Sequence, residues 1–137
     1  MAENEKMKCA YGVWKSKISP ELLSAAIGLS DPQWDTDGRT LLWREMRSGQ
    51  GVLVAQPQGE APYDLSGEVN VRGGVGYGGG DFTVQHGLAI FAGKDGRLYR
   101  RSLGAGFPKA ITPSFGGVAA PQLSPENRWV AFVHTYE

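Results

Sequence analysis

The stretch Pro32–Trp43, PQWDTDGRTLLW, decides the predicted fold of this chain, because two later segments can be laid over it. These segments are Gly80–Phe91, GDFTVQHGLAIF, and Pro121–Phe132, PQLSPENRWVAF. In each copy a large apolar residue precedes an aromatic residue by nine positions: Trp34 and Trp43, Phe82 and Phe91, Leu123 and Phe132. The leading apolar residues of successive copies are 48 and 41 residues apart. A four-stranded propeller blade takes about 40 to 50 residues, so both spacings fit one blade.

Alternating apolar residues and short, turn-prone junctions predict β-strands in and around these copies. Thr40–Glu45 and Gly51–Gln56 flank one turn, and Phe82–Gln85 and Leu88–Phe91 flank the two-residue connection His86-Gly87. Further strands are expected at residues 61–65, 97–103, 109–112, 118–123 and 128–133. We therefore predict an all-β chain that forms a partial β-propeller of about two and a half four-stranded antiparallel blades. An ordinary sandwich or barrel whose strands happen to recur is the alternative.

The spacing of the three repeats also predicts how the chain divides into an N-terminal tail and successive blades. Residues 1–28 form an N-terminal tail with one short helix, 29–69 the first blade, 70–115 the second blade and 116–137 an incomplete third blade. The helix is expected at Ser19–Ala26, where Ser19 can cap the first turn and Pro20 fits its geometry. Gly28 can end it.

The composition gives no reason to expect a nucleic-acid or membrane partner. The 14 basic residues balance the 14 acidic ones, whereas both partners need clustered surplus positive charge. Cys9 is the only cysteine, so no internal disulfide forms and nothing indicates an oxidising compartment. No run of 18 apolar residues and no apolar leader after Met1 occurs. We expect a soluble, cytoplasmic protein.

Two motifs that suggest ligand binding are better explained by turns. Gly74–Gly79 matches G-x-G-x-x-G, but a dinucleotide loop must open a helix, and a strand is predicted next. Asp35, Asp37 and Gly38 resemble part of a calcium loop, but the other oxygen ligands are missing. Aspartate and glycine are also the residues that turn geometry favours. The prediction is a flexible crossing and a turn, with no cofactor.

No catalytic or metal-binding constellation emerges from the remaining residues. His86 lies in a hairpin turn, and His134 lies near the last residue given. With Cys9 far away in sequence, these residues form neither a zinc cluster nor a Cys-His nucleophile. The large aromatics are predicted to pack in the core or between blades rather than to stack on a ligand. They are Trp14, Trp34, Trp43, Tyr99 and Trp129.

A set of short motifs resembles the N-terminal propeller of prolyl-oligopeptidase-family serine peptidases, especially the acylaminoacyl-peptidase and dipeptidyl-aminopeptidase-like branch. The resemblance covers roughly residues 11–137. Its motifs are Tyr11–Leu23, Asp31–Gly38 with Trp43–Glu45, Asn70–Arg72 followed by Gly78–Gly80, Gly96–Arg100, Ile111–Pro113 and Leu123–Pro125. Many relatives carry a His-Glu pair before the Tyr-Gly-Gly of the glycine-rich segment. Here Gly76 precedes Tyr77, so any role of that acidic residue is not transferable.

The resemblance implies the part of a peptidase that gates substrate access, without the catalytic domain. Family members place an α/β-hydrolase domain after the propeller, and its nucleophile needs a G-x-S-x-G turn. This sequence contains none. The family's glycine-rich crossings can face the central cavity, so Arg72 and Tyr77 are the candidate gating residues. The expected partner is a peptide substrate, held through a hydrolase domain absent from this chain.

A second hypothesis is a stand-alone, propeller-like interaction module that oligomerises to complete its sheet packing. Two and a half blades leave apolar blade faces and an open sheet edge exposed, and such surfaces favour association. The expected partner is then a second copy of the chain. A self-sufficient small enzyme is the third and weakest hypothesis.

Overall fold

The computed structural model describes residues 10–12, 18–21, 27–73 and 80–136, and it confirms an all-β chain built of antiparallel sheets. Alternation of apolar and polar side chains gives these segments one face to bury, which is why they form strands. The strands within this part of the chain are β1 Gly28–Trp34, β2 Thr40–Arg47, β3 Gln50–Pro57, β4 Tyr63–Asp64, β5 Phe82–Gln85, β6 Leu88–Ala92, β7 Leu98–Ser102, β8 Lys109–Ala110, β9 Gly117–Leu123 and β10 Val130–Thr135.

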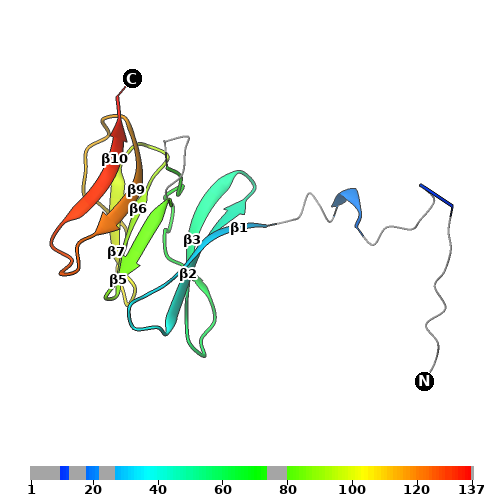
Figure 1. The fold of residues 1–137 in the computed structure, drawn as a ribbon, viewed down its shortest axis with the longest axis horizontal. Helices are drawn as coiled ribbons and strands as arrows, with labels where there is room; N and C mark the ends of the chain where they lie inside the picture. Colours follow the sequence, from blue (N-terminus) through cyan, green and yellow to red (C-terminus); the bar gives the residue numbers. More distant parts are fainter. Residues whose placement is uncertain (1–9, 13–17, 22–26, 74–79, 137) are drawn as a thin grey trace.

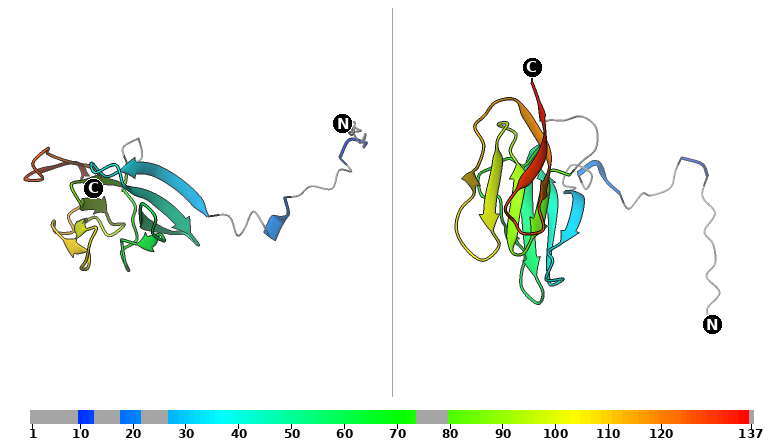
Figure 2. Two further views of the ribbon diagram at one scale, coloured as in Figure 1. Left: turned by 90° about the horizontal axis from the view of Figure 1, so that it is seen from below. Right: turned by 60° about the vertical axis from the view of Figure 1, so that its left-hand side comes forward.

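The strands form three sheets that follow one another along the chain. Sheet 1 has the order β1-β2-β3-β4, sheet 2 has the order β5-β6-β7-β8, and sheet 3 consists of β9 and β10. Each hydrogen-bonded pair is antiparallel, as short connections require. Figures 1 and 2 show the sheets lying side by side, with sheet 2 between the other two.

Sheets 1 and 2 repeat the same local chemistry in their third and fourth strands. The N–H of Leu53 in β3 donates to the Ser66 hydroxyl over 3.0 Å, and the N–H of Leu98 in β7 donates to the Thr112 hydroxyl over 2.8 Å. In both sheets the fourth strand ends before this serine or threonine, so it offers no backbone acceptor for the leucine N–H. The side-chain hydroxyl accepts the hydrogen bond instead. The third and fourth strands of the two sheets are therefore structurally equivalent, with equivalent residues about 45 positions apart in the sequence.

A glycine stands two residues before each of these leucines, for a steric reason. A Cβ at Gly51 would collide with the carbonyl oxygen of Val71, and a Cβ at Gly96 with that of Gly116. Each carbonyl belongs to the segment that crosses to the next sheet. The repeated Gly-x-Leu sequence thus lets the crossing segment lie directly against the third strand.

Sheets 1 and 3 repeat a second feature, a bulge in the first strand. Asp31 and Ala120 have φ of 52° and 50°, and both precede a proline at an interruption of the strand register. The following turns also match, because Asp35 N donates to Thr40 O and Ser124 N to Trp129 O, both over 2.9 Å. The first hairpins of these sheets are therefore equivalent, 89 residues apart.

The core consists of two apolar layers, one on each face of sheet 2. Between sheets 1 and 2 the cluster is centred on Phe82 and Phe91, which are almost completely buried. Between sheets 2 and 3 a smaller cluster joins Ala92, Leu98 and Val118, with Phe132 packed against it. Sheet 2 is thus covered by a sheet on each face.

Polar contacts tie the first hairpins of the three sheets together. Asp35, only 4% exposed, accepts the Gly87 N–H over 2.9 Å, and the Thr36 hydroxyl accepts the His86 N–H over 2.9 Å. From sheet 2, the amide of Gln85 donates to the Ser124 carbonyl over 2.8 Å. The three turns therefore lie side by side at one end of the stack.

Two expectations need correction. Phe82 was expected to correspond to Trp34, but Phe82 pairs with Phe91 whereas Trp34 pairs with Leu41. The reason is the turn, because β5 and β6 are joined by two residues and β1 and β2 by five. The helix at Ser19–Ala26 is not supported: residues 22–26 lie outside the described residues, and in the described part helical backbone is confined to Pro20 and Glu21, too short to count as a helix among the elements.

We predict that Ser66→Ala destabilises the protein by about 1–3 kcal/mol, because the buried Leu53 N–H loses its acceptor. Urea unfolding monitored by circular dichroism measures the change. Ser102→Ala, at an exposed position in β7, is the matched control and should change stability by less than about 0.5 kcal/mol. Equal effects of the two substitutions would contradict this role of the hydroxyl.

Gly51→Ala should cost about 1–3 kcal/mol, because the new methyl group displaces the backbone of the crossing segment at Val71. The same unfolding assay tests it. Gly104→Ala, where an added Cβ meets no atom within 4 Å, is the matched control and should change stability by less than about 0.5 kcal/mol. An alanine at position 51 that leaves the midpoint unchanged would refute the close approach.

Candidate functional site

The face of sheet 1 on which no other described sheet packs carries a groove lined mainly by apolar side chains. On β2, Leu41 and Trp43 point away from sheet 2, since Leu42 between them belongs to the core. The groove has a volume of about 400 Å³ and is lined by Leu29, Ser30, Pro32, Leu41, Trp43 and Gln56. Leu29 and Trp34 on β1 are 68% and 62% exposed. Large apolar side chains gathered on one surface indicate an interaction site.

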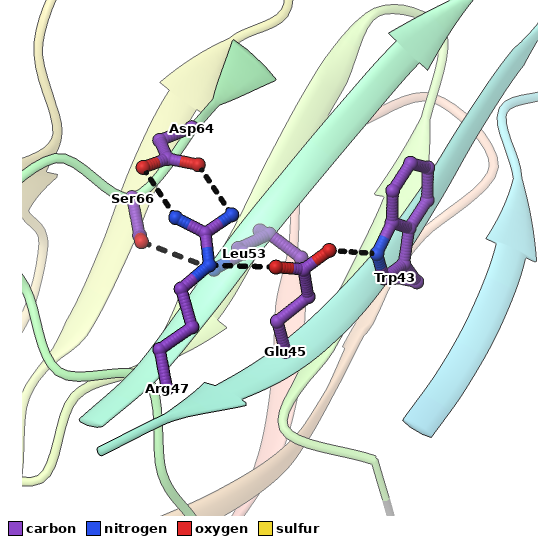
Figure 3. A network of polar contacts seen from close by, with 6 residues as sticks. All are labelled: Trp43, Glu45, Arg47, Leu53, Asp64 and Ser66. Carbon is purple, nitrogen blue, oxygen red and sulfur yellow. Dashed lines mark hydrogen bonds and ion pairs between the residues drawn. The ribbon is translucent and has the colours of Figure 1, made fainter. Parts of the chain in front are cut away.

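A chain of polar contacts runs along the same face, beside the groove. Trp43, Glu45 and Arg47 alternate along β2, so their side chains share one face (Figure 3). The Trp43 indole donates to Glu45 Oε1 over 2.8 Å, and Arg47 Nε lies 2.6 Å from Glu45 Oε2. Arg47 also forms two 2.9 Å bonds to the carboxylate of Asp64 in β4. This network fixes the indole ring that borders the groove.

The charges of this network are largely satisfied by one another. Hydrogen bonds to Asp64 and then to Glu45 raise the pKa of Arg47 above its ordinary value. Glu45 is the most shielded member, with a side chain 12% exposed, whereas those of Arg47 and Asp64 are 38% and 50% exposed. The bidentate geometry orients Arg47 more than it stabilises the fold, since water screens such pairs.

Two further hollows lie near the β6–β7 turn and share Lys94 and Asp95. One, of about 580 Å³, runs along Gly93–Gly96 and residues 114–118, and the other, of about 540 Å³, includes Glu68, Asn70 and Tyr99. The Tyr99 hydroxyl donates to Asp95 over 2.7 Å, and burial first, then this bond, raises its pKa. Within the described ranges no three histidine, cysteine, aspartate or glutamate side chains gather as metal ligands.

The structure does not test the two candidate gating residues. Arg72 is exposed at the start of the glycine-rich crossing, and its backbone N–H donates to Ala92 O over 2.9 Å. Tyr77 and the G-x-G-x-x-G motif at 74–79 lie outside the described residues. The element that follows this motif is the strand β5, as predicted. The gating role of Arg72 and Tyr77 therefore stays a prediction.

The aspartates and histidines singled out in the sequence occupy structural positions. Asp37 Oδ1 accepts the N–H groups of Arg39 and Thr40, as expected for a turn. The ring of His86 lies 3.1 Å from the Thr36 hydroxyl. His134 Nε2 lies 2.8 Å from the carbonyl oxygen of Phe115, and the ring packs against the Phe115 ring. Cys9 lies outside the described residues.

The aromatic side chains divide into two groups. Tyr99 stacks on Phe91 with ring centroids 5.7 Å apart, as the packing hypothesis predicts. Trp34 and Trp129 are instead 62% and 73% exposed, so for these two residues the expected packing between sheets is wrong. No described sheet lies over their side chains. Trp14 lies outside the described part.

The sequence prediction missed the network around Arg47 entirely. Its signal is present in the sequence as Trp43, Glu45 and Arg47 at alternate positions of one strand. Asp64, from β4, could not have been added without the register of Val54 opposite Asp64. Residues far apart in sequence meet here only through strand pairing.

Comparison with known proteins identifies no relative. No protein-family model matches the chain, no curated protein matches it, and no solved structure matches it. In the part of the chain that the structure describes, no helix has the length and apolar character needed to cross a membrane. The only class that can be stated for this protein is its fold class, an all-β chain of three antiparallel sheets within the described residues.

The coupling energy between Arg47 and Asp64 should be about 0.2–1 kcal/mol, because both side chains are partly exposed. A double-mutant cycle with Arg47→Ala and Asp64→Ala measures it, and the value should fall as sodium chloride is raised. Arg97 and Asp95, 3.8 Å apart, form the comparison pair and should couple more weakly. A coupling that salt leaves unchanged would contradict the surface character of the pair.

Proposed function

We propose that this chain is a segment of a β-propeller and acts as a non-catalytic part of a prolyl-oligopeptidase-like serine hydrolase. The observation that carries the architecture is the repeated stacking of equivalent antiparallel sheets, with sheet 2 covered on both faces. A simple sandwich has two sheets and one core between them. Three successive sheets, each packed on the previous one, favour the radial arrangement of blades.

The order of strands supports the same proposal. The first strands of successive sheets, β1, β5 and β9, lie next to one another, and the first hairpins are joined by Asp35 and Gln85. In a propeller the first strand of each blade lines the central channel. In this proposal the glycine-rich crossing that contains Arg72 and Tyr77 faces the channel.

The proposed activity is to restrict access of peptides to a hydrolase domain that this chain does not contain. The support is the set of family-like motifs, above all Asp31–Gly38 and Leu123–Pro125, which form the equivalent hairpins of sheets 1 and 3. A ring of blades excludes large substrates by the width of its channel. Short peptides then reach the catalytic domain, and folded proteins do not.

Sequencing of the transcript beyond the codon for Glu137 tests the proposal. We expect the reading frame to continue through more blades into a segment with a G-x-S-x-G turn. In that longer protein, deletion of residues 28–137 should abolish the preference for short over long peptides, measured as a ratio of kcat/KM. A stop codon directly after Glu137 would exclude the hydrolase proposal.

The purified chain of 137 residues should hydrolyse no peptide arylamide and should not react with a fluorophosphonate probe for activated serines. The physical reason is the absence of a G-x-S-x-G turn from its sequence. Release of arylamine is followed by absorbance. Turnover that co-purifies with the chain through two unrelated chromatographic steps would overturn the prediction.

A further inference from the structure

The hollow of about 540 Å³ beside the β6–β7 turn lies where the crossing segment from sheet 1 meets sheet 2. One wall is the crossing segment at residues 68–70, and the other is formed by Lys94 and Asp95 with Tyr99 of β7. The N–H of Lys94 donates to the carbonyl of Asn70 over 2.8 Å, so a backbone hydrogen bond joins the two walls. The hollow therefore does not depend on what packs on the outer faces of sheets 1 and 3.

The Tyr99 side chain forms a fixed and partly apolar wall of this hollow. Its ring stacks on Phe91 with centroids 5.7 Å apart, and its hydroxyl donates to Asp95 Oδ2 over 2.7 Å. On the crossing segment, Val69 packs against the same apolar cluster as the Tyr99 ring. Small-molecule sites combine apolar walls with a few polar groups in a volume of about 300–1,000 Å³. The hollow therefore has the size and the apolar surface that suit a small ligand.

Two opposite charges line the hollow without a partner in the protein. Lys94 brings an ammonium group, and Glu68 brings a carboxylate from the crossing segment. Within the described ranges, neither Glu68 nor Lys94 takes part in an ion pair. Asp95, by contrast, accepts the Tyr99 hydroxyl and lies 3.8 Å from Arg97 Nε. The charges left for a ligand are thus one positive and one negative.

The Asn70 side chain adds a neutral donor to the same hollow. Its Oδ1 accepts the N–H of Gly51 over 2.9 Å, which fixes the orientation of the amide. The amide Nδ2 is therefore a donor that Gly51 does not use. Because Lys94 and Asn70 are joined through their backbones, both can donate to one anionic group of a ligand.

We propose that this hollow binds a small zwitterion, an α-amino acid with an apolar side chain. The carboxylate of the ligand accepts from the Lys94 ammonium and the Asn70 amide, and its ammonium group donates to the Glu68 carboxylate. The apolar side chain of the ligand lies against Val69 and the Tyr99 ring. This inference goes beyond the proposed function and does not rest on it.

The charge pattern is what favours a zwitterion over a simple ion. An anion without an ammonium group would pair with Lys94 but meet repulsion from Glu68, and a cation without a carboxylate would meet the reverse. An α-amino acid carries both charges and an apolar group on one carbon atom. A single small molecule thus matches both charged groups and the apolar walls.

Titration of the isotope-labelled chain of 137 residues with L-leucine, followed by NMR, tests the proposal. The amide resonances of the lining residues should shift and saturate, with a dissociation constant on the order of 1–10 mM, because water screens ion pairs in an open hollow. Lys94→Met and Glu68→Gln should each weaken binding about threefold to tenfold. Lys109→Met and Glu126→Gln, at exposed positions outside the hollow, are the matched controls and should bind like wild type.

Two derivatives of the ligand assign each charge to its partner. N-acetyl-L-leucine lacks the ammonium group and L-leucine amide lacks the carboxylate, so each should bind about threefold to tenfold more weakly than L-leucine. Glu68→Gln should weaken binding of L-leucine amide but not of N-acetyl-L-leucine, and Lys94→Met should do the reverse. A general disturbance of the fold would weaken both derivatives alike and so cannot produce this exchange.

Absence of saturable shifts with L-leucine up to about 50 mM would overturn the proposal. So would N-acetyl-L-leucine that binds as tightly as L-leucine, since the hollow would then recognise only a carboxylate. Equal losses from Lys94→Met and Lys109→Met would overturn it as well. These outcomes are distinct from failure of the hydrolase proposal, which the transcript sequence and the arylamide assay test.

Discussion

The structure depends on the burial of both faces of sheet 2. A sheet with apolar side chains on both faces is stable only between two other layers, because each exposed face would leave large apolar area in water. Phe82, Ala89 and Phe91 belong to the cluster with sheet 1, while Ala92 and Leu98 belong to the cluster with sheet 3. Sheets 1 and 3 are therefore held on either side of it. The order of the three sheets in the stack follows from the need to bury both faces of sheet 2.

Polar groups then satisfy the backbone within each sheet and hold the crossing segment against sheet 1. The backbone of a strand that ends early must find another acceptor, and Ser66 and Thr112 provide it at equivalent places. Arg44 reaches from sheet 1 to Asp81 over 2.9 Å, so the crossing segment is held between two sheets. Because the Arg44–Asp81 contact is short and directional, it restricts the position of the crossing segment against sheet 1 more than apolar burial alone would.

The strands could be predicted from the sequence because period-two alternation and turn residues are local signals. The pairing register of the strands could not be predicted in this way. Trp34 pairs with Leu41, whereas Phe82 pairs with Phe91. Five residues join β1 to β2 but only two join β5 to β6, and His86 and Gly87 both have positive φ, as that tight turn requires. A fixed nine-residue spacing therefore leads to different ladder partners. The exposure of individual side chains could not be predicted from the sequence either, because it depends on which sheet faces have another sheet packed on them.

The network beside the groove makes the uncovered face suitable for burial. A sheet that docks there would remove the Trp43 indole and the Glu45 carboxylate from water, and an unpaired polar group would oppose this. Both groups already have partners within sheet 1, because the indole donates to Glu45 and Glu45 is paired with Arg47. Desolvation of this face therefore leaves no donor or acceptor of these two side chains unsatisfied. Apolar contact at Leu29, Leu41 and Trp43 then favours packing of a sheet on this face, against the cost of removing water from the Arg47–Asp64 pair, whose side chains are 38% and 50% exposed.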